Sequence, residues 1–238
     1  MRLSMARSYG TFASLVERWL FLFPHMIVLT LSLTAAGATL AESAAANAAK
    51  PIKMVVLGDS LSAGFGLAAV EAFPARLQKA LKDKGIDVDM TNAGVSGDTS
   101  SGGRDRLDWS VPEGTEAVII ELGANDALHG TDPSVTRAAL SGILSRLKAR
   151  GIAVLLCGMV APPNYGSEYA SRFNSIYPDL AKSFGVALYP FFLDGVAADA
   201  RLNQADGIHP TPAGVDTIVN RMMPTVEAFL GTLRQQNR

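Results

Sequence analysis

Apolar residues fall into short runs that alternate with longer segments of helical periodicity. Three runs are apolar almost throughout, and they predict strands buried on both faces of a sheet. They lie at 52–58, within 116–126 and at 152–159. A fourth segment, 86–94, alternates apolar and polar residues like an edge strand, and 186–192 predicts a short last strand.

Amphipathic patterns separate these runs and predict helices. A glycine ends two of the predicted helices, and Pro178 and Pro224 are expected to divide or interrupt the last two. The predicted helices cover 73–85, 132–151, 168–185 and 211–233, with a shorter one within 100–109. Alternation of this kind predicts one α/β domain, a three-layer αβα sandwich with about five parallel strands.

The first part of the chain has a different composition from the rest. Basic residues precede a long apolar run that ends in small residues, with Thr39 and Ala41 at the −3 and −1 positions of a cleavage site. This pattern predicts a signal peptide over 1–41, an Ala-rich spacer over 42–51 and the folded domain over 52–238. An uncleaved membrane anchor is the alternative, because the run is almost long enough to span a bilayer. We expect a periplasmic or secreted protein whose only membrane contact is this leader, if it is uncleaved.

Charge and composition exclude some classes of partner and site. The formal net charge is −1, so no basic field indicates nucleic acid as a partner. The single cysteine, Cys157, lies in an apolar run and is expected to be a buried thiol. Only His129 and His209 follow the leader, and no His-Glu-x-x-His sequence occurs, which argues against a zinc site.

Polar and small residues follow the predicted strands, and a fourth such segment precedes the last helix. In a parallel sheet covered on both faces, ligands bind outside the carboxyl ends of the strands, so these segments are expected to meet there. The four segments are Gly58-Asp59-Ser60, Asn92-Ala93-Gly94, Gly123-Ala124-Asn125-Asp126 and Asp206-Gly207-Ile208-His209.

The residue types in these segments suit acyl transfer. A serine such as Ser60 becomes nucleophilic when an imidazole takes its proton, and the imidazole needs a carboxylate to fix its tautomer. Asp206 and His209 are three residues apart and are expected to hydrogen-bond within one turn. The Ser60 N–H, the Gly94 N–H and the Asn125 amide are the candidate donors to an oxyanion.

Other interpretations remain open at this point. Ser60 alone is also typical of a helix N-cap. A second Asp-x-x-His sequence, Asp126 to His129, also follows a strand, and spacing does not decide between the two histidines. The stretch 64–69 fits the Gly-x-Gly-x-x-Ala dinucleotide pattern, but it does not follow the strand directly as that fingerprint requires.

Four blocks together resemble the SGNH hydrolases, also called the GDSL family. The blocks are "GDSLS", "NAGVSGDTS", "GAND" and "DGIHP". They are most similar to the branch of thioesterase I, protease I and lysophospholipase L1 proteins and bacterial arylesterases. The resemblance implies a flavodoxin-like αβα sandwich, Ser60, Asp206 and His209 as triad, and Gly94 and Asn125 in the oxyanion hole. It places the base just before the final helix, which favours His209 over His129, and it implies no cofactor or metal.

The resemblance also implies a small-molecule acyl substrate. We expect hydrolysis of carboxylic esters, with acyl thioesters or lysophospholipids as extensions. A carbohydrate-ester O-deacetylase and a non-catalytic binding protein on the same fold are the alternatives. Asp59 is expected to shape the turn before Ser60 and is also a candidate for substrate contact. The expected substrate-binding positions are Asp59, Leu61, Leu128, Met159 and Pro162.

Overall fold

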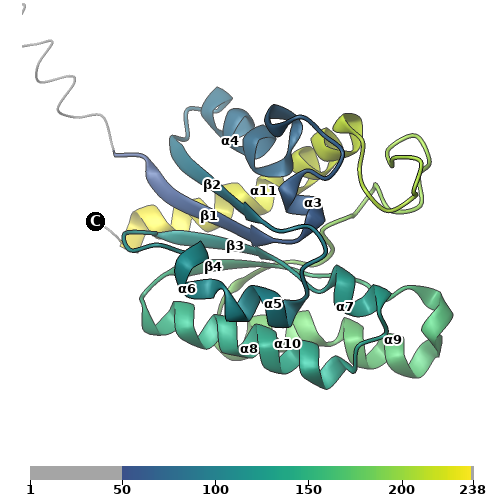
Figure 1. The fold of residues 1–238 in the computed structure, drawn as a ribbon. Helices are drawn as coiled ribbons and strands as arrows, with labels where there is room; N and C mark the ends of the chain where they lie inside the picture. The colour runs from purple at the N-terminus through teal and green to yellow at the C-terminus, as the bar shows by residue number, and fades with distance from the viewer. Residues whose placement is uncertain (1–49, 237–238) are drawn as a thin grey trace, which may run out of the picture. The chain divides into compact units, whose positions relative to one another are not determined.

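The computed structural model describes residues 50–236 (Figure 1). The predicted signal peptide and most of the predicted spacer lie outside the described residues. The strands are β1 Ile52–Gly58, β2 Val88–Gly94, β3 Ala117–Glu121, β4 Ala153–Cys157 and β5 Ala187–Tyr189. The helices are α3 Ser60–Ala63, η1 Ala69–Glu71, α4 Phe73–Asp83, α5 Ser100–Asp105, α6 Leu107–Ser110, α7 Ala124–Leu128, α8 Pro133–Ala149, η2 Pro163–Tyr165, α9 Gly166–Asn174, α10 Ile176–Phe184 and α11 Pro212–Gln236.

The five strands form one sheet in the order β2-β1-β3-β4-β5, with every neighbouring pair parallel. The predicted αβα sandwich is therefore confirmed, and β2 lies at an edge as its alternating pattern indicated. In Figure 1, α4 and α11 cover one face of the sheet and α5, α8 and α10 cover the other. Gly58 pairs in register with both Gly94 and Glu121, so β1, β2 and β3 end at one level.

The core lies between the sheet and its two helical layers. The central residues of β1, β3 and β4 have almost no exposed surface, which explains why these strands are apolar throughout. Cys157 is fully buried at the end of β4, as predicted, and burial raises the pKa of its thiol well above the ordinary value. Cys157 is therefore a packing residue.

Proline has different effects in the two long helical segments. The segment 168–185 is divided at Ser175, which puts Pro178 in the first turn of α10, where a missing N–H is tolerated. The prediction that Pro224 interrupts the last helix was wrong, because α11 runs through it. Pro224 faces solvent, so water can satisfy the carbonyl one turn earlier, while buried Met223 and Val226 hold the helix to the sheet.

Strand β5 is shorter than predicted and ends at Tyr189. The next residues leave the sheet, and Phe191 and Leu193 reach the carboxyl-end face instead. Between residues 50 and 236, no helix combines the length and apolarity needed to cross a bilayer.

Candidate active site

The turn after β1 places Ser60 at the carboxyl edge of the sheet. Asp59 caps helix α3, because its Oδ1 accepts a hydrogen bond from the Leu61 N–H at 2.9 Å. Glycine is required at 58, since a Cβ there would collide with Ser62 and approach Glu121 Oε2 to 2.7 Å. Strand β1 therefore delivers Ser60 as the first residue of a helix at the edge predicted to hold the site.

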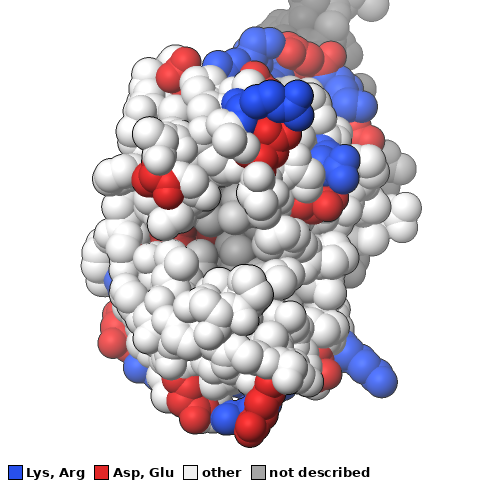
Figure 2. Space-filling view, turned by 90° about the vertical axis from the view of Figure 1, so that its right-hand side faces the viewer, with Lys and Arg blue, Asp and Glu red and all other residues white. Residues whose placement is uncertain are grey.

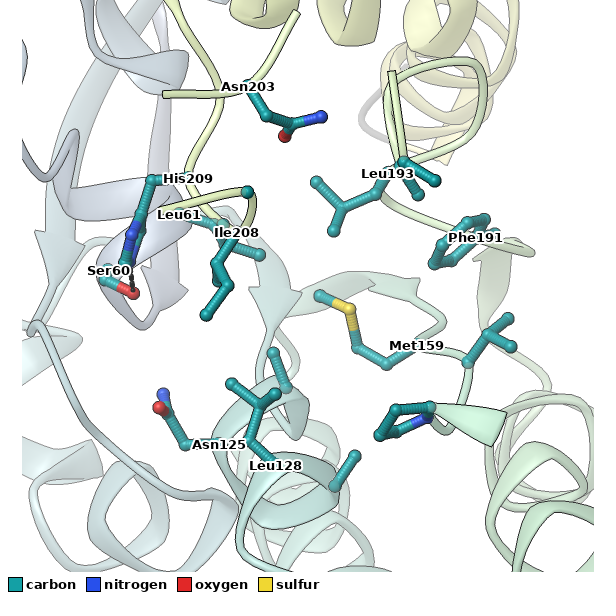
Figure 3. Close-up of a pocket in the computed structure, with 17 residues that line it drawn as sticks. Ser60, Leu61, Asn125, Leu128, Met159, Phe191, Leu193, Asn203, Ile208 and His209 are labelled. Atoms are coloured by element: carbon teal, nitrogen blue, oxygen red, sulfur yellow. Dashed lines mark hydrogen bonds between the residues drawn. The ribbon is translucent and has the colours of Figure 1, made fainter. Parts of the chain in front are cut away.

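Ser60, His209 and Asp206 form a continuous chain of polar contacts. His209 Nε2 lies 2.9 Å from Ser60 Oγ, and its Nδ1 lies 2.7 Å from Asp206 Oδ2 (Figure 3 shows the Ser60–His209 contact). Asp206 Oδ1 also accepts the backbone N–H groups of Ile208 and His209. These bonds lower the pKa of Asp206 to about 2, and the bond from the His209 backbone N–H contributes most. The predicted contact across one turn is confirmed.

The loop that carries His209 is tied back to the segment after Ser60. The Gln204 side-chain amide donates to the carbonyls of Phe65 at 2.8 Å and Pro210 at 3.0 Å. The ring of Phe65 packs against the imidazole of His209, with centroids 4.5 Å apart. Segments far apart in the chain are thereby held in one arrangement around the imidazole.

The second Asp-x-x-His sequence has a different structure. Asp126 is buried, and its carboxylate accepts bonds from the Ser100 N–H, the Ser100 hydroxyl and the Thr136 hydroxyl, between 2.5 and 2.9 Å. His129 is the exposed C-cap of α7. Geometry therefore joins Ser60 to His209, and Asp126 ties α7 to α5 and α8.

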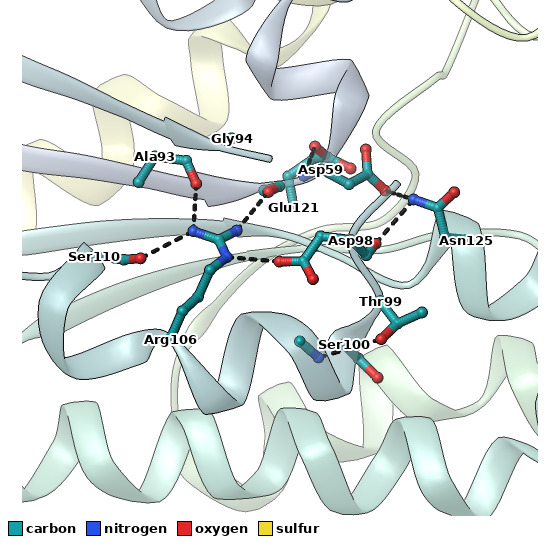
Figure 4. Close-up of polar contacts among 12 residues, drawn as sticks. Asp59, Ala93, Gly94, Asp98, Thr99, Ser100, Arg106, Ser110, Glu121 and Asn125 are labelled. Carbon is teal, nitrogen blue, oxygen red and sulfur yellow. Dashed lines mark hydrogen bonds and ion pairs between the residues drawn. The ribbon is translucent and has the colours of Figure 1, made fainter. Parts of the chain in front are cut away.

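Asn125 lies in the first turn of α7, beside Ser60 and His209 at the same cavity. Its Nδ2 donates to the Asp98 carbonyl at 2.9 Å and to Asp59 Oδ2 at 3.1 Å (Figure 4). The preceding Gly123 has φ 114°, and a Cβ there would meet the Tyr177 hydroxyl, so this turn needs glycine.

Gly94 is close to this site, although neither it nor Gly97 lines the cavity. Its N–H donates to Asn92 Oδ1 at 2.9 Å, so the expected oxyanion donor is engaged within its own strand. A Cβ on Gly94 would lie within 3 Å of Ala63 N and Asp59 O, so this glycine lets β2 pack under α3. Sequence reasoning missed Gly97, which has φ 82° and whose N–H has no acceptor among residues 50–236. The small residues of "SGDTS" were the available signal.

The cavity beside Ser60 has a volume of about 370 Å³ and opens on the carboxyl-end face. Figure 2 shows a hollow in this face with mostly uncharged side chains around it. Four expected substrate-binding positions line the cavity: Leu61, Leu128, Met159 and Pro162. The structure adds Val160, Phe191, Leu193, Ala197, Ala198 and Ile208. Phe191, Leu193, Ala197 and Ala198 escaped sequence reasoning because 191–198 looked like strand end and loop.

Asp59, the fifth expected substrate contact, is fully buried and lies behind the cavity wall. Its carboxyl touches Asn125 and not the open space. Burial is the main cause that raises the pKa of Asp59 to about 7. Glu121, also fully buried, accepts bonds from the Ser62 hydroxyl and the Asp59 N–H, and burial raises its pKa well above the ordinary value.

A serine, imidazole and carboxylate in this order, with an amide beside the serine, have the arrangement of serine hydrolases. Residues 56–216 match the model of the GDSL-like Lipase/Acylhydrolase family. Esterase TesA of Pseudomonas aeruginosa is 42% identical over 178 residues, which cover 74% of this chain and 89% of that protein. Thioesterase 1/protease 1/lysophospholipase L1 of Escherichia coli is 37% identical over 216 residues, 89% of this chain and 95% of that protein.

The fold agrees with these matches. A crystal structure of TesA superimposes with a TM-score of 0.71 and 40% identity, covering 74% of this chain and 99% of that one. The chain belongs to the GDSL-like lipase/acylhydrolase family and is a hydrolase that acts on carboxylic esters.

Proposed function

We propose that Ser60 is the nucleophile, with His209 as its general base and Asp206 as the carboxylate that orients the imidazole. His209 takes the Ser60 proton as Oγ attacks the ester carbonyl, and it then gives that proton to the leaving alcohol. Water repeats the sequence on the acyl-enzyme and releases the acid. The chain of contacts from Ser60 Oγ through His209 to Asp206 is the observation that carries this proposal.

We also propose which groups stabilise the oxyanion. The Ser60 N–H has no acceptor among the described residues, and the Asn125 amide lies beside it at the cavity. The Gly94 N–H is bonded to Asn92, whereas the Gly97 N–H precedes Asp98, whose carbonyl holds the Asn125 amide. We therefore assign the third donor to Gly97. Fixed donors of this kind contribute to the rate because they need no reorganisation as charge develops.

The cavity supports esters with an apolar acyl or aryl group. Its volume, about 370 Å³, lies in the range of about 300–1,000 Å³ that is usual for small-molecule sites. Apolar side chains form most of its wall, while Ser60, His209 and Asn125 lie together on one side (Figure 3). The Asn203 amide, on another part of the wall, donates to the Val196 and Asp199 carbonyls. We propose short to medium acyl esters as substrates, with acyl thioesters and lysophospholipids as extensions that the names of the relatives support.

The location of the protein in the cell is a separate proposal. We infer export to the periplasm or exterior of a bacterium, with 1–41 removed and 52–238 as the catalytic domain, from the leader sequence. N-terminal sequencing of the protein recovered outside the cytoplasm tests this inference. A start near residue 42 supports it, and an intact leader in the membrane fraction supports the uncleaved anchor.

Hydrolysis of p-nitrophenyl esters from acetyl to palmitoyl tests the activity. The full chain is compared with Ser60→Ala and with His129→Ala, which removes a histidine outside the triad. Turnover that is absent in Ser60→Ala and kept in His129→Ala supports the triad. Highest rates at short to medium chains support the proposed acyl pocket. Activity on acetyl groups alone, extending to acetylated sugars, favours the O-deacetylase, and turnover that survives Ser60→Ala contradicts the mechanism.

A further inference from the structure

The Asn125 side-chain amide is held by two acceptors in the absence of substrate. Its nitrogen carries two hydrogens, and both have partners: the Asp98 carbonyl at 2.9 Å and Asp59 Oδ2 at 3.1 Å. Because both partners accept, the amide oxygen cannot take the nitrogen's place without facing two other oxygens. The amide therefore has one favoured orientation (Figure 4).

The Asp59 carboxyl, one of these two acceptors, is itself fixed. Its other carboxyl oxygen accepts the Leu61 N–H at 2.9 Å, its backbone N–H lies 3.3 Å from Glu121 Oε2, and its side chain has no exposed surface. Burial is the main cause that raises the pKa of Asp59. Asp59 is thus a rigid acceptor for the Asn125 amide.

The other acceptor, the Asp98 carbonyl, belongs to a residue that Arg106 holds in place. Arg106 Nε is 2.6 Å from Asp98 Oδ2, and the guanidinium is almost fully buried. The same guanidinium donates to the carbonyl of Ala93, at the end of β2, and to the carbonyl of Gly58, the residue before Asp59, each at 2.8 Å. One side chain therefore ties together the two loops that hold the Asn125 amide.

We propose that Asp59 and Arg106 are positioning residues that keep the Asn125 amide aimed at the oxyanion. The inference rests on the proposed function, in which Asn125 is an oxyanion donor. An amide fixed before the substrate binds loses no free energy to reorientation in the transition state. The oxyanion carries full charge and so competes well with a neutral carbonyl for a shared N–H.

A double-mutant cycle with Asn125→Ala tests whether Asp59 and Arg106 act through the amide. Asp59→Asn keeps the size of the side chain but leaves an NH₂ group facing either the Leu61 N–H or the Asn125 amide. We expect a fall in kcat of about 10- to 100-fold with KM nearly unchanged, less than the loss of a whole donor. In the Asn125→Ala background, the same change should cost less than about threefold, because its target is gone.

Arg106→Lys tests the same amide through its other acceptor, Asp98. Lysine keeps the charge but loses the planar donor fork, and the fall in kcat that this substitution causes should also be smaller in the Asn125→Ala background. Asp132→Asn is the matched control, because Asp132 caps α8 through the N–H two residues on, as Asp59 caps α3. Asp132 lies outside the cavity wall, and its kcat should stay within about twofold of the unmodified chain.

Fully additive losses in both cycles would overturn the inference, because Asp59 and Arg106 would then act without Asn125. If Asn125→Ala itself leaves kcat unchanged, the proposed oxyanion donor fails first, and the two failures are distinguishable. A variant that does not fold is replaced by a measurement on the unmodified chain. The Asn125 amide protons should exchange with water more slowly than those of exposed Asn220, and equal rates would contradict the inference.

Discussion

Two Asp-x-x-His segments of this chain share a spacing but not a structure. At 206–209, the aspartate accepts the backbone N–H groups of its own turn and meets the imidazole at 2.7 Å. At 126–129, the aspartate belongs to α7 and points into the layer between α5 and α8, where three donors satisfy it. His129 is left exposed at the end of the helix.

The difference shows that backbone conformation, and not residue spacing, decides what an aspartate does. In the loop before α11, Asp206 can fold back on its own turn, since no helix directs its side chain elsewhere. In α7, the helix directs the Asp126 carboxylate into the core. There it accepts hydrogen bonds from the Thr136 hydroxyl of α8 and the Ser100 hydroxyl in the first turn of α5. One aspartate therefore serves the imidazole and the other serves packing.

Replacing each histidine breaks the comparison most strongly. His209→Ala removes the proposed base, and kcat for p-nitrophenyl esters should fall by about 10⁴-fold or more. His129→Ala should leave kcat within about twofold, since its side chain is exposed and away from the Ser60–His209 contact. Equal losses for the two variants would contradict the assignment of the base.

Asp206→Asn tests the carboxylate that orients the imidazole. The amide cannot hold the tautomer that accepts the Ser60 proton, so kcat should fall by about 10³–10⁴-fold while the fold persists. Steady-state kinetics, together with a circular dichroism spectrum that matches the unmodified chain, check this outcome. A loss below tenfold would remove Asp206 from the triad.

Asp126→Asn should act on stability instead. The NH₂ group of the new amide must face either the Ser100 N–H or the hydroxyls of Ser100 and Thr136, at a cost of about 1–3 kcal/mol in the free energy of unfolding. Urea unfolding measures this cost against Asp206→Asn, whose partly exposed side chain should matter less. A smaller loss for Asp126→Asn than for Asp206→Asn would reverse the interpretation.

The smallest effect concerns acid stability. The pKa of Asp206 is lowered to about 2 in the folded chain, below its ordinary value of 3.8. Its stabilising contribution is therefore present above about pH 4 and is lost as the pH falls toward 2. The difference in stability between the unmodified chain and Asp206→Asn should be constant above pH 5 and should shrink between pH 4 and pH 2. A difference independent of pH would contradict this shift.

Much of this architecture follows from local pattern. Alternating buried strands and amphipathic helices specified the αβα sandwich, because a sheet of apolar strands must be covered on both faces. The strand ends then brought Ser60 and Asn125 to the same edge as His209, as expected for parallel strands. The position of the triad candidates was predictable for that reason.

The remaining features depend on contacts that spacing does not reveal. The engagement of the Gly94 N–H depends on the rotamer of Asn92, and the burial of Asp59 depends on Glu121, 62 residues away. The continuity of α11 through Pro224 depends on which face of the helix meets the sheet. The first is a local rotamer and the other two are tertiary properties, and the sequence pattern alone specifies none of them.

Covalent trapping of the nucleophile tests the central claim most directly. The full chain is incubated with a p-nitrophenyl alkylphosphonate ester, and the adduct is located by peptide mass spectrometry alongside the release of p-nitrophenol. We predict one equivalent of p-nitrophenol and a single adduct on Ser60, with trapping strongly slowed in His209→Ala. An adduct on another residue, or no adduct in a chain that hydrolyses esters, would contradict the account.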